Sequence, residues 1–226
     1  MPVILNIETS TTLCSVTLSK DGIVIASKEI NDGFTHAENL HVFIEEILTK
    51  AGLSAKDINA VAVGSGPGSY TGLRIGVAAA KGLAFALQIP LIAVNTLQIM
   101  AASVMKDNKQ KTLLCPMLDA RRMEVYTAVF DEELNVVKET SAQILTEGIS
   151  FFETGKPICF FGEGMPKCKE LLKQIPGSTF IDNIVPSSTA LAQLSYEKYV
   201  NGQFEDVAYF EPFYLKDFLI KTKNGQ

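Results

Sequence analysis

Histidine is scarce in this chain of 226 residues, and tryptophan is absent. The two histidines, His36 and His41, fall in one predicted helix. Five helical residues turn by about 500°, so the two rings point about 140° apart and cannot share one metal ion. Neither an H-E-x-x-H zinc motif nor a G-x-S-x-G nucleophile elbow occurs. We therefore expect no metal-binding and no catalytic residues, although a dyad that uses a single histidine stays open.

Basic residues are also few. The formal net charge is −5, and no run of lysine and arginine forms a basic face. Proteins that bind nucleic acid by themselves usually neutralise phosphates with such a face. A role on RNA would therefore need a partner protein to hold the RNA. The four cysteines contain no C-x-x-C pair, which argues against a zinc site or a disulfide framework and favours a reducing compartment.

The sequence shows no signal peptide and no long membrane-spanning run. Met1 is followed almost at once by a strand pattern. The longest uncharged stretch, residues 82–105, contains two glutamines, an asparagine and a proline, so it is typical of a buried core rather than of a membrane span. We therefore expect a cytoplasmic protein.

The chain does contain one order of predicted elements twice. An apolar strand that ends in an acid is followed by two strands, a helix and a further strand, first from Val3 and again from Thr112. Glu8 and Asp119 are the two acids. A three-strand meander joined to helix-linked strands predicts a mixed sheet covered by helices. The sequence therefore predicts an α/β protein with two such lobes facing each other across a cleft.

The lobe boundary is predicted near residues 107–111, a polar stretch between apolar runs. The first lobe would span residues 1–107 and carry helices at 36–51 and 71–87. The second, smaller lobe would span residues 108–226. Its last helix is predicted near Thr189–Asn201, and its C-terminal segment is free to pack back on the first lobe. A single larger α/β domain stays open as the alternative.

Two loops of the first lobe could line the cleft. The turn after the first strand offers hydroxyl and N–H groups for a phosphate, and Glu8 could hold a hydrated Mg²⁺. The glycine-rich loop at residues 64–76 precedes a helix, where N–H groups favour an anion, but it lacks the ending of a P-loop. A polar hairpin that satisfies its own backbone is the alternative. The residues of this predicted, vestigial nucleotide cleft are Glu8, Thr9, Ser10, Gly66 and Gly68.

The helix predicted at residues 71–87 carries few charges. Gly72, Gly76 and Ala79 lie on one face and would allow a close approach to the sheet. A helix face turned to solvent rarely presents Val, Ala and Phe with so few charges. We therefore expect the opposite face to be a protein interface, unless the other lobe or the C-terminal tail covers it. That face holds Arg74, Val77, Ala78, Lys81, Phe85 and Gln88.

The counterpart of the Glu8 turn in the second lobe is basic. Arg121 and Arg122 follow Asp119, where a phosphate-gripping hairpin should have glycines. Bulky side chains there argue against a self-sufficient nucleotide cradle. The arginines could pair with Glu8 or Glu124 across the cleft, which is the simpler reading, or they could contact a phosphate.

Several strings of this sequence together resemble the TsaB (YeaZ) family, over nearly the whole chain. They are I-E-T-S at 7–10, G-P-G-S-Y-T-G-L-R-I-G at 66–76, L-D-A-R at 118–121, E-V-Y at 124–126 and E-P-F-Y-L at 211–215. The resemblance implies two RNase H-like or actin-like (ASKHA) lobes. It also implies a paralogue of the enzyme TsaD that lacks the H-x-x-x-H metal motif of that enzyme.

The resemblance further implies a function. The chain would be a noncatalytic subunit that binds and activates a TsaD-like enzyme. With a TsaE-like ATPase, that enzyme places threonylcarbamoyl on N6 of adenosine 37 in tRNAs that read ANN codons, and this chain would reach tRNA only through the complex. Homologues also carry a peptidase label, which this sequence does not support. Helices of the first lobe form the subunit contact in the family, which by position implies an interface of Phe43, Glu46, Arg74, Val77, Ala78, Lys81 and Phe85.

Two other functions stay open. The chain could be an actin-like ATPase or small-molecule kinase that uses Glu8 and the loop Gly66–Gly72, or a homodimeric regulator without an RNA connection. We expect no cofactor, with weak binding of ATP or ADP and Mg²⁺ left open. A homodimer of the isolated chain is left open as well. The missing metal pair and the basic second hairpin favour the partner subunit over the enzyme.

Overall fold

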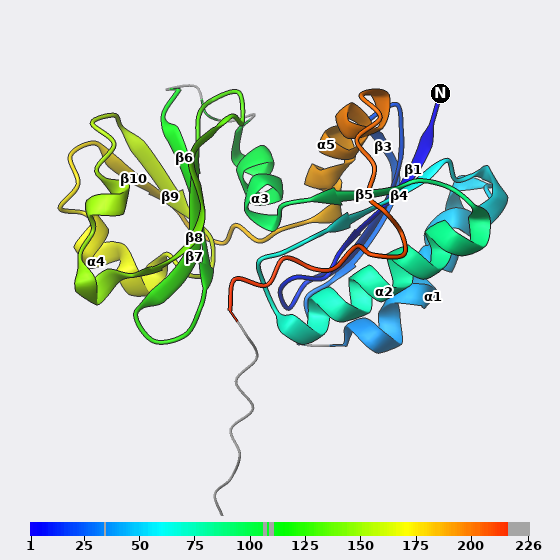
Figure 1. The fold of residues 1–226 in the computed structure, drawn as a ribbon, viewed down its shortest axis with the longest axis horizontal. Helices are drawn as coiled ribbons and strands as arrows, with labels where there is room; N and C mark the ends of the chain where they lie inside the picture. The colour runs from blue at the N-terminus through cyan, green and yellow to red at the C-terminus, as the bar shows by residue number, and fades with distance from the viewer. Residues whose placement is uncertain (34, 106–107, 109–110, 217–226) are drawn as a thin grey trace, which may run out of the picture.

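The computed structural model describes residues 1–33, 35–105, 108 and 111–216. Within this part the chain forms two mixed sheets of five strands, each flanked by helices (Figure 1). The predicted lobe boundary at residues 107 and 108 falls partly outside the described residues. No helix in the described part is both long and apolar enough to cross a membrane.

The first sheet has the strand order β3-β2-β1-β4-β5. β1 to β3 form an antiparallel meander, and β1, β4 and β5 run parallel. A tight turn at Asp21 and Gly22, both with positive φ, joins β2 to β3, whereas helices return the chain to the start of β4 and β5. The strands are Val3–Glu8 (β1), Cys14–Lys20 (β2), Ile23–Ile30 (β3), Ala60–Gly64 (β4) and Leu91–Val94 (β5).

The second sheet repeats this topology in the order β10-β9-β6-β7-β8. β6 to β8 are antiparallel, and β9 and β10 run parallel to β6. The repeat confirms the predicted pair of α/β units. The prediction lacked β10, a short strand directly after a Pro-Gly turn. The strands are Leu113–Asp119 (β6), Glu124–Phe130 (β7), Val136–Ile144 (β8), Ile158–Phe161 (β9) and Ser178–Ile181 (β10).

Helices cover both faces of the first sheet (Figure 1). Successive strand residues point to opposite faces. Leu5 and Ile7 of β1 therefore pack in a core with two helices, α1 and α2, whereas Ile4 packs with α5 on the other face. The α-helices are His36–Ala51 (α1), Tyr70–Leu87 (α2), Thr96–Met105 (α3), Lys169–Leu172 (α4) and Ser188–Val200 (α5).

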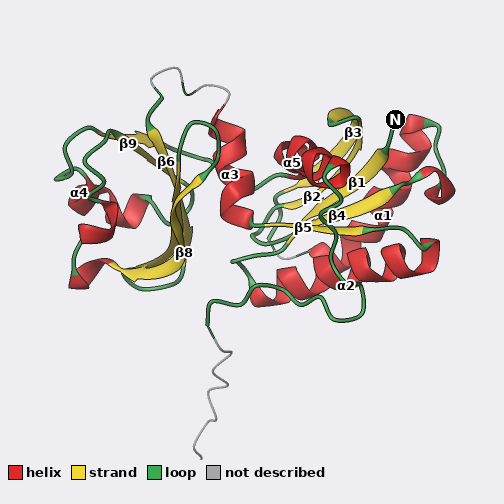
Figure 2. Cartoon of the chain, turned by 45° about the horizontal axis from the view of Figure 1, so that its top comes forward, coloured by secondary structure: helices red, strands yellow, loops and turns green. Residues whose placement is uncertain are grey.

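Two helices are exchanged between the halves of the sequence. α5 follows the second sheet along the chain but packs on β1 and β2 of the first sheet. α3 precedes the second sheet but packs on β6 and β7 of that sheet, and it also contacts α5 (Figure 2). The helix predicted near Thr189–Asn201 thus completes the first sheet, not the second sheet of the lobe to which the sequence assigns it.

Buried hydroxyl groups fix α5 on the first sheet. Ser188 Oγ lies 2.5 Å from Ser15 Oγ and 2.7 Å from Thr17 Oγ1. Further along α5, Ser195 Oγ donates to Asn6 Oδ1 at 2.6 Å. Buried polar groups need such partners, so these hydrogen bonds favour one register of α5 on β1 and β2.

The helices predicted in the second half are shorter than expected. The segment near Leu145–Glu153 forms two 3₁₀ turns, which Gly148 separates with a φ of 130°. The segment near Pro166–Gln174 forms a 3₁₀ turn followed by α4. Leu145 and Phe152 are buried. The apolar spacing therefore identified core residues correctly, but it predicted a longer helix than the structure has.

Candidate functional site

The turn after β1, predicted to face a ligand in the cleft, is buried. Glu8, Thr9 and Ser10 are each at most 1% exposed. Glu8 Oε1 accepts a hydrogen bond from the Ser10 N–H at 2.6 Å, whereas Oε2 has no hydrogen-bond partner of good geometry in the described residues. Burial raises the pKa of Glu8, and the Ser10 side chain and the N–H groups of Ser10 and Thr9 lower it in part.

The glycine that ends β4 and a glycine of the loop after it make room for this turn. A Cβ atom at Gly64 would lie 2.0 Å from Glu8 Oε2, and a Cβ atom at Gly68 would lie 2.4 Å from the Ser10 carbonyl oxygen. Cβ atoms do not approach other heavy atoms so closely. Both positions therefore need glycine because the Glu8 turn occupies the space that a side chain would fill.

The glycines inside α2 serve the same contact. A Cβ atom at Gly72 would lie 2.1 Å from the Thr9 carbonyl oxygen, and one at Gly76 would lie 2.2 Å from Thr9 Oγ1. Thr9 Oγ1 also donates a hydrogen bond to the Gly72 carbonyl at 2.8 Å. α2 can therefore lie directly against the end of β1, as the small residues on its inner face predict.

The five residues of the predicted nucleotide cleft are neighbours, but their contacts lie within the chain. Gly66 adopts a φ of 105°, and a Cβ atom there would lie 2.8 Å from the Phe213 carbonyl oxygen. Contacts to the chain itself thus account for the glycine spacing, and nucleotide binding at this site stays a prediction. Among the described residues no cluster of three or more His, Cys, Asp and Glu side chains could hold a metal ion.

Lysines, rather than arginines, pair with the acids of the second hairpin. Lys167 Nζ lies 2.5 Å from Asp119 Oδ1, and Lys216 forms an ion pair with Glu124. Arg121 and Arg122 are exposed, and both have positive φ, at 72° and 49°. The predicted pairing of the arginines is therefore wrong for both acids. Glu8 is buried away from them, and Glu124 pairs with Lys216 instead.

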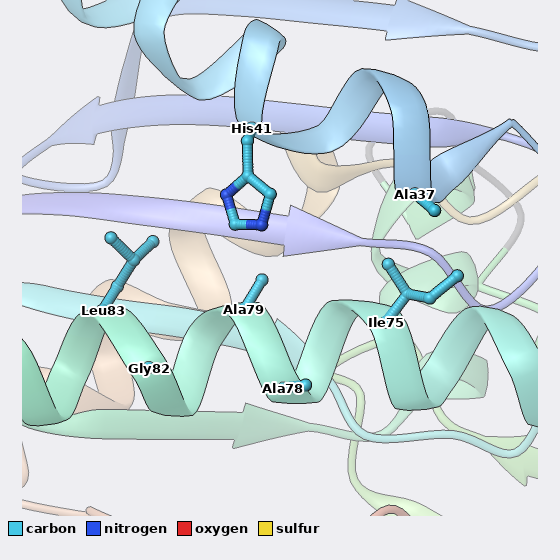
Figure 3. Close-up of a pocket in the computed structure, with 7 residues that line it drawn as sticks. All are labelled: Ala37, His41, Ile75, Ala78, Ala79, Gly82 and Leu83. Carbon is cyan, nitrogen blue, oxygen red and sulfur yellow. The ribbon is translucent and has the colours of Figure 1, made fainter.

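A shallow apolar groove of about 460 Å³ lies between α1 and α2 (Figure 3). The His41 ring extends from α1 toward α2 between Leu83 and Ala79. His36, five residues earlier, points inward instead, and its Nε2 lies 2.7 Å from the Thr11 carbonyl oxygen. The groove is lined by Ala37, His41, Ile75, Ala78, Ala79, Gly82 and Leu83.

Gly82 differs from the other glycines of α2. It is exposed, and a Cβ atom there would meet no heavy atom within 4 Å. Glycine inside a helix lowers helix stability by about 1 kcal/mol relative to alanine. Among the described residues, no contact requires a glycine at this position.

The predicted outer face of α2 is exposed in part. Arg74 and Ala78 are exposed, and Phe85 is 78% exposed. Val77, which was predicted on this face, is 4% exposed and belongs to the core of the first sheet, so it offers a partner almost no surface. Lys81 is half-buried, since its ammonium group donates to carbonyl oxygens of the C-terminal segment.

Of the two predicted interface residues of α1, one is buried and the other is exposed. Phe43 is 4% exposed and its ring packs in the core beneath Lys28, so it offers a partner almost no surface. Glu46 is exposed and forms an ion pair with Lys28. Ala37 and His41, which line the groove, were not among the predicted residues, although their spacing of four residues places them on one exposed stripe of the predicted helix.

Comparison with known families and proteins gives consistent matches. The family model described as "TsaD: tRNA N6-adenosine threonylcarbamoyltransferase" matches residues 29–219. The tRNA threonylcarbamoyladenosine biosynthesis protein TsaB of Escherichia coli (strain K12) is 33% identical, over 95% of this chain and 94% of its own length. The Bacillus subtilis (strain 168) protein of the same name is 29% identical, over 94% and 93% of the two chains.

Solved structures agree with these relatives. YeaZ from Pseudomonas aeruginosa is 27% identical with a TM-score of 0.82, covering 95% of this chain and all of its own. An activator of 2-hydroxyisocaproyl-CoA dehydratase from Clostridium difficile is 11% identical with a TM-score of 0.51, over 89% and 97% of the two chains, which supports the actin-like (ASKHA) fold alone. The chain belongs to the TsaB (YeaZ) family, within the wider group that the TsaD family model describes.

Proposed function

We propose that this chain is a noncatalytic subunit that binds and activates a TsaD-like enzyme. The shared reaction would be N6-threonylcarbamoylation of adenosine 37 in ANN-decoding tRNAs, with a TsaE-like ATPase as a further component. The names of the relatives, which are tRNA threonylcarbamoyladenosine biosynthesis proteins, support this proposal.

The observation that carries the proposal is the open groove between α1 and α2. Its floor is apolar, and Gly82 leaves space in its wall that nothing in the described chain fills. Small residues on a helix let another backbone approach closely, and apolar surface next to polar residues is typical of protein interfaces. A folded partner with an apolar helix or loop fits this surface better than a small ligand does.

The buried turn at Glu8 supports a noncatalytic role. A carboxylate that acts on a substrate must reach it, and Glu8 is 0% exposed beneath Gly64. All four cysteines are buried as well, which gives no support to the peptidase label carried by homologues. These contacts also argue against an ATPase or kinase that uses Glu8 and the Gly66–Gly72 loop.

The net charge of −5 supports an indirect role on RNA. Phosphate contacts supply most of the affinity for nucleic acid, and they need a cluster of basic side chains. In this proposal the tRNA is held by the other subunits, and this chain acts through the enzyme that it contacts.

Reconstitution tests the proposal. We expect tRNA modification by the TsaD-like and TsaE-like proteins to depend on this chain. The Ala78→Asp variant should fail to support modification, because it places a charge in the groove. Ile23→Asp, which changes a 70% exposed apolar residue of β3, is the matched control and should remain active. ATP turnover by the isolated chain, lost in Glu8→Ala, would instead favour the enzyme alternative. Modification that proceeds equally well without the chain would refute the proposal.

A further inference from the structure

The segment that follows α5, residues 203–216, lies along α2, and we call it the C-terminal strap (Figure 1, orange to red). It starts beside the edge strand β5, where the Glu205 N–H donates to the Leu91 carbonyl at 2.9 Å. It ends near the start of α2, where the Tyr214 ring centroid lies 5.0 Å from that of Tyr70. The strap therefore runs antiparallel to α2 and covers one flank of it.

A lysine of α2 holds the middle of the strap. Lys81 Nζ donates to the carbonyl oxygens of Ala208 and Phe210, at 3.2 Å and 2.8 Å. Asp206 Oδ1 accepts hydrogen bonds from the N–H groups of Ala208 and Tyr209, at 2.8 Å and 3.2 Å. Phe210 packs against the core of the first sheet. The turn at residues 206–210 is thus fixed from both sides.

Tyr209 projects from this fixed turn. Its side chain is 84% exposed, although tyrosine is large and mostly apolar. A side chain on a rigid turn loses little backbone entropy on binding. Tyrosine is also enriched among the residues that dominate interface energies. The strap therefore presents Tyr209 in a form suited to binding.

Tyr209 adjoins the surface already proposed for the partner. Phe85 follows Lys81 by four residues, which is one helical turn and about 40° of rotation, so it lies beside the strap. Phe85 also follows Gly82 of the groove by three residues, on the adjoining face of α2. Phe85, which is 78% exposed, therefore lies on α2 between the face that lines the groove and the flank that the strap covers.

We propose that the docking surface for the TsaD-like subunit extends over the C-terminal strap, with Tyr209 and Phe85 as its aromatic anchors. This inference rests on the proposed function and adds residues that lie outside α1 and α2. The matching surface of the partner is an apolar recess large enough for two rings. Asp206 and Glu211 are exposed on the same strap, and their negative charges oppose RNA or an anionic membrane as the occupant.

Binding measurements with the intact chain and its TsaD-like partner test this inference. We expect Tyr209→Ala to weaken binding by about tenfold or more, and Tyr209→Phe to stay within about threefold, because the ring supplies most of the buried area. Ile23→Ala, which truncates another exposed apolar side chain, should bind as the parent does. The melting temperature of Tyr209→Ala should equal that of the parent, since the side chain has few neighbours to lose.

The outcomes separate this inference from the proposed function. If Ala78→Asp abolishes binding while Tyr209→Ala binds like the parent, the strap is not part of the surface and the proposed function stands. If neither variant affects binding, the docking surface includes neither the groove nor the strap, and the inference is overturned. If the parent chain itself does not bind the TsaD-like subunit, the proposed function is refuted. A photo-crosslinking amino acid at position 209 gives an independent readout. Crosslinks to the TsaD-like subunit support the inference, and crosslinks only to a second copy of this chain overturn it.

Discussion

Two glycines of α2 lie six residues apart, about one and two-thirds turns, in contrasting surroundings. A Cβ atom at Gly76 would lie 2.2 Å from Thr9 Oγ1, whereas one at Gly82 would meet no heavy atom within 4 Å. The sequence marks both as unusual for a helix but does not say which is needed for packing, because an absent side chain leaves no pattern of its own. The contacts of Thr9, in the turn after β1 and more than 60 residues away along the chain, decide the difference.

Replacing each of these two glycines by alanine should change the free energy of unfolding in opposite directions. We expect Gly82→Ala to raise the free energy of unfolding by about 0.5–1 kcal/mol, because alanine is the better helix former. Gly76→Ala should lower it by about 1–3 kcal/mol, because the added methyl group collides with Thr9. Chemical denaturation of the isolated variants measures both. Gly82→Ala should also weaken binding to the TsaD-like partner. Equal effects of the two substitutions on stability would contradict the conclusion that Gly76, but not Gly82, is needed for packing.

Glu8 is the second residue whose role depends on contacts that the sequence does not reveal. Its place at the end of an apolar strand predicts a polar group at a cleft, but the Gly64 backbone and the Ser10 N–H enclose it. Burial raises its pKa in the folded protein above the ordinary value of 4.5. The folded state therefore holds the proton more tightly than the unfolded state does, and the associated stability is lost as the pH rises through the folded pKa.

This linkage predicts a pH-dependent difference between the parent and Glu8→Gln. The amide keeps an acceptor for the Ser10 N–H and has no proton to lose. We expect the melting temperature of the parent to fall relative to that of the variant as the pH is raised from about 5 to about 8. Thermal unfolding over this range measures the effect, with Glu45→Gln at an exposed position of α1 as the control. Parallel profiles for parent and Glu8→Gln would show that Glu8 is not shifted.

α2 and the C-terminal strap form one unit at the scale of elements. The periodicity of α1 and α2 predicted both helices and most of their buried residues, since each packs one face on a sheet. The same periodicity placed Val77 on the outside, because it could not include Val207 and Phe210, which pack into the same core from the strap. Helical spacing identifies a buried face only when every neighbour of that face is known.

The strap leads to a prediction about local stability. Lys81→Met keeps the apolar stem but removes both hydrogen bonds to the carbonyl oxygens of Ala208 and Phe210. Each hydrogen bond from a charged donor contributes about 1.5–3 kcal/mol at most, and less where the donor is half-buried. We expect faster hydrogen exchange at Tyr209 and Phe210, with little change in α5. Lys198→Met on α5 is the control. Unchanged hydrogen exchange in the strap of Lys81→Met would show that the Lys81 hydrogen bonds are not needed to hold the strap in place.

The exchange of α3 and α5 determines how the whole molecule holds together. The repeated order of strands predicted two sheets, and both are present. It could not predict which helix covers which sheet, because the order of elements along the chain does not fix the sheet on which a helix packs. The choice depends on matched surfaces, such as the buried hydroxyl groups of Ser188 and Thr17. Each half of the sequence is therefore incomplete by itself.

This dependence is testable with a fragment. Residues 1–107, the predicted first lobe, lack α5 and would expose the face of the first sheet that holds Ile4, Ala62 and Ile92. We expect this fragment to show no cooperative thermal unfolding by circular dichroism. Joining residues 185–216 to it through a Gly/Ser linker should restore a cooperative transition. A sharp transition in the fragment alone would mean that α5 is dispensable for the first sheet.

α5 emerges from the ribosome late, although the first sheet is complete only when α5 packs on it. About 100 residues separate β5 from the end of α5, which corresponds to roughly 5–20 seconds of translation. During that time α1 and α2 rest on a sheet with one bare side. A chain truncated before α5 would therefore have a less stable groove between α1 and α2, and it would lack Tyr209 of the strap. We expect a TsaD-like partner to bind the full-length chain in preference to such a truncated one.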